Sequence, residues 1–213
     1  ISADGKMKFD WFLDENGNDV GEGAQALAKV DTVQTQGRLP ELKECRFRIA
    51  CDVINPLCGD DGATFVYGPQ KGVTDDMKQP LDMAMAHFAD VTATALGKDL
   101  RDVPGTGAAG GLGFAFLSYL NARLTPGIDL ILDAVKLEDE LADADIVVTG
   151  EGRLDFQTAM GKAPVGVARL AKKHGAKVIA FAGGVTKEAR ACNGAGIDAF
   201  FPVVRGVTTL EEA

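Results

Sequence analysis

The chain has few of the residues that build thiol, zinc and triad sites. It contains two histidines and four cysteines among 213 residues. Cys45, Cys51, Cys58 and Cys192 form no C-x-x-C pair and have no histidine at the spacing of a zinc site. Neither histidine has an evident acid or nucleophile as its partner, which disfavours triad chemistry. We interpret the cysteines as buried, reduced thiols, which are typical of a cytoplasmic protein.

Positive charge and long apolar runs are also scarce. The 22 Lys and Arg residues are outnumbered by 31 Asp and Glu residues, so the net charge is −9. Nucleic acids and anionic membranes call for a basic face, and we therefore expect neither as a partner. No apolar run reaches the roughly 20 residues of a membrane-spanning helix. A small anion is not excluded, because backbone N–H groups can hold it locally.

Two widespread nucleotide and hydrolase motifs are absent. Gly161-Lys162 has the wrong spacing for a Walker A loop and lacks the following Ser or Thr, and there is no G-x-S-x-G sequence. Residues 105–110 do match G-x-G-x-x-G. The segment before them, "GKDLRDVP", has a proline and two aspartates where a dinucleotide-binding fold needs a strand. A nicotinamide-dependent oxidoreductase is therefore disfavoured.

The first 125 residues combine helical and strand patterns. Aromatic alternation predicts a strand over Met7–Leu13, and Cys45–Val53 alternates between apolar and charged residues and predicts another. From Met77 onward, apolar residues recur at a helical period. Because Pro80 interrupts that pattern, we place the start of this helix near Pro80 rather than at Thr74. A further helix is predicted through "FAFLSYLNARL".

The last seventy residues change character. Three short apolar segments, "DIVVTGEG", "KVIAFAGG" and "DAFFPVV", alternate with helical patterns. Alternation of this kind predicts a parallel sheet covered by helices. We therefore predict an α/β protein of two α/β units. Residues 1–125 form a mixed α/β domain with the glycine-rich loop, and residues 126–213 form part of a flavodoxin-like or Rossmann-like parallel domain.

The glycine-rich loop is the first candidate site. Gly105, Gly107, Gly110 and Gly111 lead into a predicted helix. Free N–H groups and the helix dipole at such a point favour an anion. Close packing of the helix is an equally good explanation for Gly110, Gly111 and Gly113, and the loop alone does not separate the two interpretations.

The second candidate site is the segment Thr149–Gly166, "TGEGRLDFQTAMGKAPVG". It follows a predicted strand and so lies at the carboxyl edge of a parallel sheet, where open α/β folds bind ligands. Carboxylates, a guanidinium and an ammonium together suit a metal-bound phosphate. The alternative is a solvated loop whose charges pair with one another. The candidate residues are Gly150, Glu151, Arg153, Asp155, Gln157 and Lys162.

The third candidate site follows the strand Cys45–Val53. Asp52 stands at the carboxyl end of that strand, a common position for a base or a metal ligand, and Asn55 turns the chain. Asp60 is a further candidate, although capping of a helix is a strong alternative role for it. Gln70 and Lys71 add an amide and a cation.

These three segments, in this order and spacing, resemble the bacterial type I glycerate kinase family. The resemblance lies in "ACDVINPLCGDDGATFVYGPQKG", "DVPGTGAAGGLGFAF" and "IVVTGEGRLDFQTAMGKAPVGVA", and extends more loosely over nearly the whole chain. It implies ATP-dependent phosphorylation of D-glycerate with Mg²⁺ on a two-domain α/β scaffold. The alternative function is a non-catalytic α/β module that binds a small anion or metabolite.

The resemblance suggests roles for the charged residues. Asp52 is our first candidate for the carboxylate that orients the glycerate hydroxyl, and Asp155 is the second. Arg153 would hold the glycerate carboxylate or the phosphoryl group, and Lys162 would neutralise phosphate charge. Glu151 or Asp155 would hold Mg²⁺. We expect these polar turns to converge on one cleft.

Two features set the chain apart from the family pattern. It lacks the opening strand and the loop with Asp, Ser and Lys, and it stops within what looks like a first helical turn. We expect it to be the middle and late portion of a longer kinase, inactive alone. The sequence leaves open whether the 2- or the 3-hydroxyl is phosphorylated and whether the protein is a homodimer.

Overall fold

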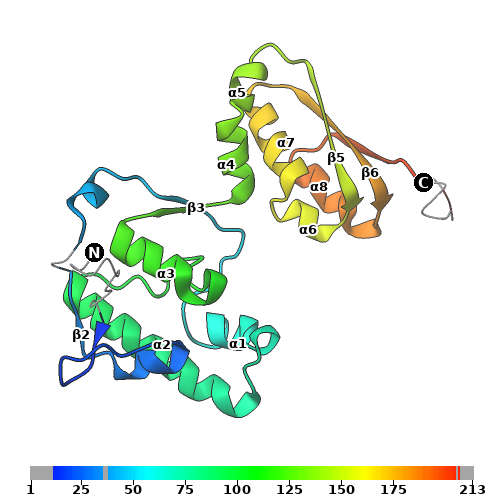
Figure 1. Cartoon of the computed structure of the whole chain (residues 1–213). Helices are drawn as coiled ribbons and strands as arrows, with labels where there is room; N and C mark the ends of the chain where they lie inside the picture. The colour runs from blue at the N-terminus through cyan, green and yellow to red at the C-terminus, as the bar shows by residue number, and fades with distance from the viewer. Residues whose placement is uncertain (1–11, 36–37, 205, 207–213) are drawn as a thin grey trace. The chain divides into compact units, whose positions relative to one another are not determined.

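The computed structural model describes residues 12–35, 38–204 and 206 (Figure 1). The chain divides into two compact units that meet between Pro126 and Gly127. We call them the first and the second unit and describe each by itself. The predicted boundary was residue 125.

The first unit is mainly helical, with two small sheets. Strands β1 and β2 pair antiparallel, whereas β3 and β4 pair parallel. Of the strand predicted over residues 7–13, residues 7–11 lie outside the described residues. The elements are β1 (Phe12–Leu13), η1 (Ala24–Lys29), β2 (Thr32–Val33), η2 (Pro40–Lys43), β3 (Arg48–Ala50), α1 (Ala63–Tyr67), η3 (Pro69–Lys71), α2 (Asp75–Leu96), α3 (Ala108–Leu120) and β4 (Arg123–Thr125).

Helix α2 begins earlier than the sequence predicts. Its N-cap is Thr74, and Pro80 lies inside the helix, so the predicted start near Pro80 is wrong. Two aspartates in the first turn complement the helix dipole. Burial of the apolar face, including Met85 and Phe88, outweighs the backbone hydrogen bond that Pro80 removes.

Aromatic rings fill the core of the first unit. Phe88 meets Phe12 and Phe114 edge to face, with ring centroids 5.2 and 5.8 Å apart. The hydroxyl groups of Thr92 and Tyr119 lie 2.6 Å apart within this core. Burial raises the pKa of Tyr119 to about 12, so this phenol is neutral at any physiological pH.

The strand predicted over Cys45–Val53 is shorter than expected. Only Arg48–Ala50 pairs, in register with Arg123–Thr125. A second prediction is also wrong: the helix expected to continue to Leu124 ends at Leu120. Residues 123–125 instead form β4, because they pair with β3. All four cysteines are free thiols, but the prediction that they are buried holds for Cys192 and fails for Cys45, which is exposed.

The second unit is a parallel three-stranded sheet with the strand order β5-β6-β7. Helix α7 packs against β5 and β6. The predicted α/β class and the helix-covered parallel sheet are therefore confirmed. The elements are α4 (Gly127–Ala134), α5 (Leu137–Glu140), β5 (Ile146–Leu154), α6 (Phe156–Ala159), α7 (Ala163–Lys173), β6 (Lys177–Val185), η4 (Lys187–Arg190), α8 (Ala191–Gly194) and β7 (Ala199–Pro202).

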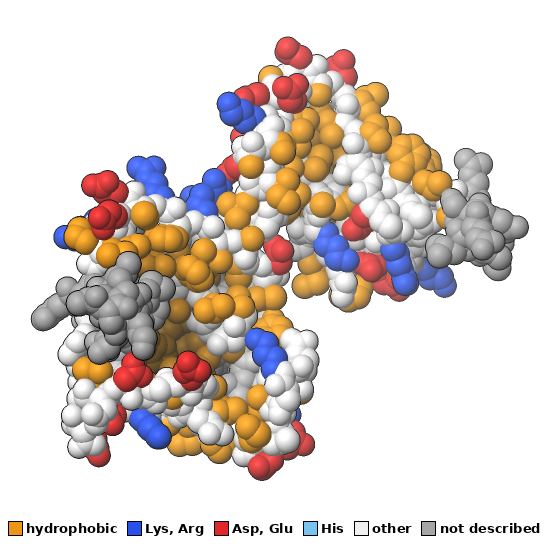
Figure 2. Space-filling model, in the orientation of Figure 1, with side chains coloured by type: hydrophobic (Ala, Val, Ile, Leu, Met, Phe, Trp, Pro, Cys, Tyr) orange, Lys and Arg blue, Asp and Glu red, His pale blue; other side chains and the backbone are white. Residues whose placement is uncertain are grey.

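The two faces of this sheet differ. Val178, Ala180 and Ala182 are buried on the face toward α7, which contributes small residues such as Ala168 to the same core. The other face exposes apolar side chains among the described residues, and Figure 2 shows hydrophobic atoms gathered over β5 and β6. The exposed set includes Ile146, Val148, Phe181 and Phe201, with the two phenylalanine rings 5.8 Å apart.

No helix in the described ranges combines the length and the apolar character needed to cross a membrane.

Candidate functional site

The glycine-rich loop packs tightly against the segment that follows β3. A Cβ atom on Gly105 would stand 2.7 Å from the sulfur of Cys51, and one on Gly107 would stand 2.2 Å from the carbonyl oxygen of Pro56. A Cβ atom on Gly111 would stand 2.8 Å from the terminal methyl carbon of Met85. Close packing therefore accounts for these three glycines, whether or not the loop also binds an anion.

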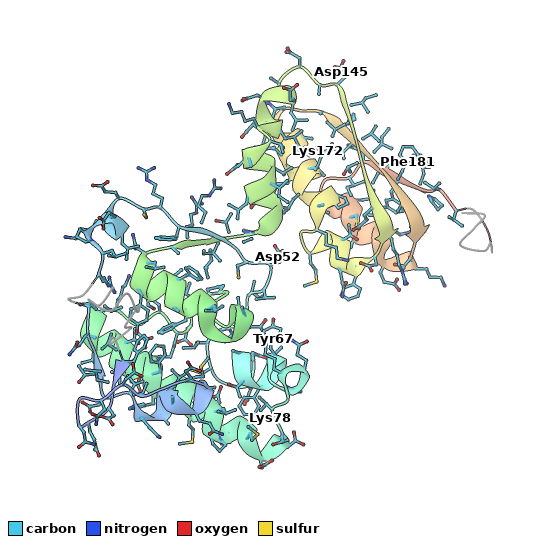
Figure 3. The ribbon with its side chains drawn as sticks, in the orientation of Figure 1. Asp52, Tyr67, Lys78, Asp145, Lys172 and Phe181 are labelled. Carbon is cyan, nitrogen blue, oxygen red and sulfur yellow. The ribbon has the colours of Figure 1, made fainter. Side chains whose placement is uncertain are left out.

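Asn55 joins the loop to the two neighbouring candidate segments. Its carbonyl oxygen accepts a hydrogen bond from the N–H of Gly107 at 3.0 Å. Its side-chain amide donates to the carbonyl of Asp61 at 2.8 Å and accepts from the hydroxyl of Tyr67 at 2.6 Å. Tyr67 is the last residue of α1 (Figure 3). The amide of Asn55 thus holds the turn together. Neither Asp60 nor Asp61 caps α1, since the N-cap residue is Gly62, so the capping alternative is wrong.

One side of the loop faces a cation. Ala109, Gly110 and Gly111 adopt left-handed backbone conformations with φ of 53°, 74° and 98°, which places a kink just before the regular part of α3. The ammonium group of Lys71 lies 3.2 Å from the position that a Cβ on Gly110 would occupy. Gln70 is exposed beside Lys71 on η3. The side of the loop at Gly110 therefore has a positive charge next to it.

Asp52 is exposed two residues beyond the end of β3. Its neighbours Cys51 and Val53 both lie against Gly105, since the Cys51 sulfur and the Val53 carbonyl are the contacts that a Cβ there would meet. The first unit thus brings the Asp52 segment, Asn55 and the glycine-rich loop together.

The sequence interpretation missed Asp82. This residue lies on the buried side of α2, where both of its carboxylate oxygens accept the N–H of Gly59 at 3.0 Å. Burial raises the pKa of Asp82; the Gly59 hydrogen bond opposes that rise and the charge of Asp60 adds to it. The sequence did contain a signal for this residue, because Asp82 follows Leu81 directly in the apolar stripe of the helix. Its role is to fix the turn that carries Asp60.

In the second unit, Thr149–Leu154 is strand and not loop, which corrects the sequence interpretation. Strand β5 runs to Leu154 and pairs with β6 as far as Val185. Gly150 is required there, because a Cβ would stand 2.4 Å from the carbonyl oxygen of Phe181. Arg153 pairs in register with Gly184 near the carboxyl end of the sheet.

Asp155 is the N-cap of α6. Its carboxylate accepts the N–H groups of Gln157 and Thr158 at 2.9 and 3.2 Å, and the Thr158 hydroxyl accepts the N–H of Asp155 in return. The ammonium nitrogen of Lys162 lies 3.7 Å from a carboxylate oxygen of Asp155. Desolvation acts to raise the pKa of Asp155, but the hydrogen bond from Thr158, the charge of Lys162 and smaller contributions together hold the pKa below its ordinary value. Asp155 therefore has a structural role whatever else it does.

Glu151 and Asp155 converge on one hydroxyl group. The buried Thr158 hydroxyl donates to Glu151 and lies 3.5 Å from an oxygen of Asp155. One or two carboxylates, with water and phosphate oxygens, are what Mg²⁺ commonly takes, so the donor set fits that ion. Within the described ranges, no group of three or more His, Cys, Asp and Glu side chains could hold a metal by itself.

The cations of the second unit differ in their surroundings. Lys162 is near Asp155, whereas Arg153 is exposed and forms no ion pair with a carboxylate among the described residues. Gln157 is exposed on α6. Arg153 is thus available to an anionic ligand without breaking a contact that the fold uses.

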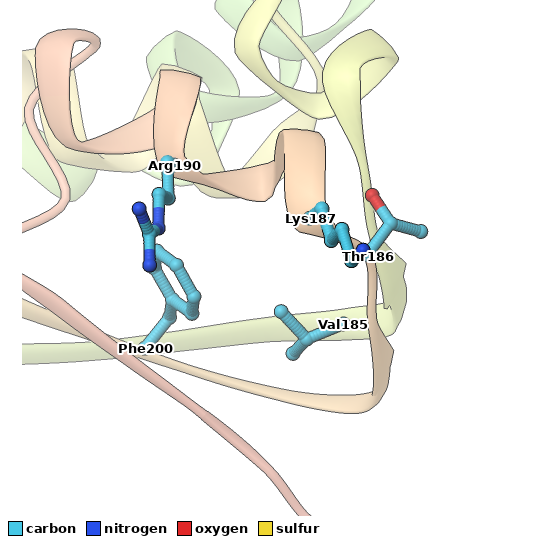
Figure 4. A pocket seen from close by; sticks show the side chains of 5 residues that line it. All are labelled: Val185, Thr186, Lys187, Arg190 and Phe200. Atoms are coloured by element: carbon cyan, nitrogen blue, oxygen red, sulfur yellow. The ribbon is translucent and has the colours of Figure 1, made fainter.

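Beside this edge lies a pocket that the sequence interpretation missed. Its volume is about 450 Å³, and it is lined by Val185, Thr186, Lys187, Arg190 and Phe200 (Figure 4). The local signal was "GGVTK", in which two glycines lie in the last residues of β6 and a lysine follows the strand. Phe200 comes from a later strand, and only the sheet register brings it near.

The two units thus carry separate sets of candidate residues. Asp52, Asn55, Asp60, Gln70, Lys71 and the loop glycines belong to the first unit. Gly150, Glu151, Arg153, Asp155, Gln157 and Lys162 belong to the second. Each set is brought together within its own unit, and convergence of the two sets on one cleft stays a prediction.

Comparison with known proteins gives a consistent result. The model of the glycerate kinase family matches residues 9–213. The chain is 47% identical to a glycerate kinase of Bacillus subtilis and 45% identical to a glycerate 2-kinase of Escherichia coli, in each case over 94% of this chain and 53% and 52% of the relative. A crystal structure assigned to a glycerate kinase 2 of Salmonella typhimurium LT2 superposes with a TM-score of 0.79 at 43% identity, over 95% of this chain and 52% of that one. The chain spans about half the length of the curated relatives it matches.

Proposed function

The chain belongs to the glycerate kinase family, and from that premise we propose that the complete protein transfers the terminal phosphoryl group of ATP to D-glycerate. The observation that carries this proposal is the identity of 42–47% to five relatives named as glycerate kinases. The relative from Escherichia coli is named glycerate 2-kinase, and we extend the proposal to the 2-hydroxyl group.

The residues suit a reaction in which the protein chiefly positions its substrates and neutralises charge. Phosphoryl transfer passes through a loose, anionic transition state, so it needs cations more than covalent chemistry. Arg153 offers a planar fork for the glycerate carboxylate or for the moving phosphoryl group. Lys162, and Lys71 beside the glycine-rich loop, offer point charges for phosphate oxygens. The exposure of Arg153 and its lack of an ion pair within the described ranges support this role.

Asp52 is our candidate for the carboxylate that accepts the proton of the attacking hydroxyl. The alternative, Asp155, already accepts two backbone N–H groups and lies near Lys162. Hydrogen bonds to a carboxylate stabilise its charged form and weaken it as a base. Asp52 is exposed at a strand end, next to the segment that holds the loop.

Glu151 and Asp155 are our candidates for the Mg²⁺ site. When bound, the ion would supply charge neutralisation on the phosphate oxygens. The shared hydroxyl of Thr158 keeps both carboxylates at the same place and leaves their other oxygens for the ion or its water. Binding of Mn²⁺ to the complete protein, followed by electron paramagnetic resonance, should weaken in Glu151→Gln without any need for turnover.

A coupled assay of ADP release tests the function directly. The complete protein is supplied with ATP and Mg²⁺, and with D-glycerate, L-glycerate, D-lactate or no acceptor. We expect ADP release that depends on D-glycerate, with the product assigned to 2- or 3-phosphoglycerate by phosphorus NMR. No ATP consumption with any hydroxy acid would instead favour a binding module, and ATP consumption that is independent of every hydroxy acid would contradict the kinase function.

A further inference from the structure

The pocket next to η4 lies on the helix-covered face of the second unit, along the outermost described strand. Phe200 pairs in register with Ala180, and its side chain packs partly against the core that Ala180 enters. Val185 ends β6, and Thr186 and Lys187 follow directly. The pocket therefore opens near the carboxyl end of β6, at the edge of a parallel sheet where ligands commonly bind.

Two cations face this pocket without partners of their own. Lys187 and Arg190 stand three residues apart on η4, so they project from the same side of a 3-10 helix. Both are exposed, and within the described part of the chain neither lies within ion-pair distance of a carboxylate. The intervening Glu188 accepts a hydrogen bond from its own backbone N–H, which is the main cause of its lowered pKa.

The rest of the lining is mainly apolar and consists of Val185 and Phe200 with the polar Thr186. In Figure 4, Arg190 and Phe200 stand together on one side, and Val185 lies across from them with Thr186 and Lys187. A ligand that fits must therefore combine anionic groups with a flat or apolar part. The volume of about 450 Å³ is within the usual range for small-molecule sites. A small, fully polar acid phosphate would leave Phe200 and Val185 without a partner.

We propose that this pocket binds a nucleoside polyphosphate, with phosphate oxygens between Lys187 and Arg190 and the nucleoside against Phe200 and Val185. The proposal rests on the kinase function proposed above and specifies where its nucleotide binds. Arg153 lies opposite Gly184 in the neighbouring strand, and Thr186 donates its N–H to the carbonyl of Leu154 at 3.0 Å. The pocket thus adjoins the strand end that carries the candidate phosphate-binding residues of the second unit.

Titration of the complete protein with ADP, followed by calorimetry, tests the site without turnover. Lys187→Ala and Arg190→Ala should each weaken ADP binding about tenfold, the loss expected when one charge-assisted contact is removed. Lys177→Ala is the control, because it removes a positive charge from the amino end of β6, whereas η4 follows the carboxyl end of that strand. Phe200→Leu should weaken ADP, whereas Phe201→Leu, on the opposite face of β7, should not.

The outcomes separate this site from the kinase function. If wild-type protein releases ADP only with D-glycerate while both cation variants bind ADP normally, the kinase function stands and the pocket assignment is overturned. If the variants lose ADP affinity although no hydroxy acid is phosphorylated, the pocket stands and the function fails. Weakened binding of phosphoglycerate with unchanged ADP affinity would place the acid product in the pocket and overturn the nucleotide assignment. Circular dichroism of each variant confirms that it is folded.

Discussion

Arg153 and Asp155 are two residues apart, and their side chains have different surroundings. Asp155 caps α6 through two backbone N–H groups, so part of its charge is already used by the fold. Arg153 has no carboxylate within ion-pair distance among the described residues and is exposed. At the scale of single residues, Asp155 is a carboxylate that the fold uses, and Arg153 is a cation available for a ligand.

Replacement of Arg153 by alanine should separate turnover from stability. In the complete protein we expect turnover with D-glycerate to fall by about 10²-fold or more, because removal of a group that stabilises developing charge has an effect of that size. The melting temperature should stay nearly unchanged, since no packing or ion pair is lost. Arg169→Ala is the control: Arg169 is also exposed but is paired with Asp129, and its loss should leave turnover intact. Wild-type turnover in Arg153→Ala would remove this residue from the site.

Asp198 should make part of the stability depend on acid pH. A hydrogen bond from Lys172, followed by one from the N–H of Val178, lowers its pKa from 3.8 to about 2. Because the folded pKa is depressed, the stabilisation is complete above the unfolded value and is lost as pH falls from 3.8 toward 2. The difference in urea midpoint between wild type and Asp198→Asn should therefore narrow over that window. Asp143→Asn, at an exposed turn, is the control, and a difference that stays constant with pH would contradict the prediction.

At the scale of elements, the prediction succeeded where the signal is local. Helix α7 follows from Pro164 in its first turn, from Lys172 and Lys173 in its last turn, and from Gly175, which adopts a φ of +79° after it. Helix α2 was misplaced at its start because burial of a whole apolar face outweighed the local effect of Pro80. Local preference is a weak guide when tertiary packing opposes it.

The extension of β5 could not be predicted from neighbouring residues. Thr149–Leu154 is rich in glycine and charge, which is typical of a loop, yet it pairs with β6 along its length. The reason is a distant contact, the close approach of Gly150 to the backbone of Phe181. The pocket escaped prediction in the same way, since Phe200 joins Lys187 and Arg190 only through the register of β7 with β6.

Gly150→Ala should destabilise the second unit, and Gly152→Ala should not. A Cβ at residue 150 would stand 2.4 Å from the carbonyl oxygen of Phe181, whereas one at residue 152 would meet nothing within 4 Å. Because the obstacle is backbone, we expect the first substitution to lower the free energy of unfolding by about 1–3 kcal/mol. Urea unfolding of both variants measures the difference. Equal stability of the two would mean that β5 and β6 do not approach as closely as described.

At the scale of the whole molecule, the part of the chain that the structure describes forms two hydrophobic cores. Aromatic rings around Phe88 and Phe114 form one core, and small residues between α7 and the sheet form the other. A ligand that binds only the folded form of one unit stabilises that unit against unfolding. Amide hydrogen exchange, which reports opening region by region, can therefore locate the nucleotide without a measurement of turnover.

We predict that ADP protects the amides of the second unit. At a concentration about 100-fold above its dissociation constant, a ligand contributes about 2.7 kcal/mol to the state that binds it, which slows exchange through unfolding of that state about 100-fold. The gain should appear in β6 and β7 and should be lost in the Lys187→Ala, Arg190→Ala double variant. Exchange in α2 provides the internal comparison, because it reports the core of the first unit. Protection that is confined to α2 and α3 would place the nucleotide in the first unit and contradict the assignment of the pocket. A gain of protection in β6 and β7 that persists in the double variant would also contradict it, because other residues of the second unit would then hold the phosphates.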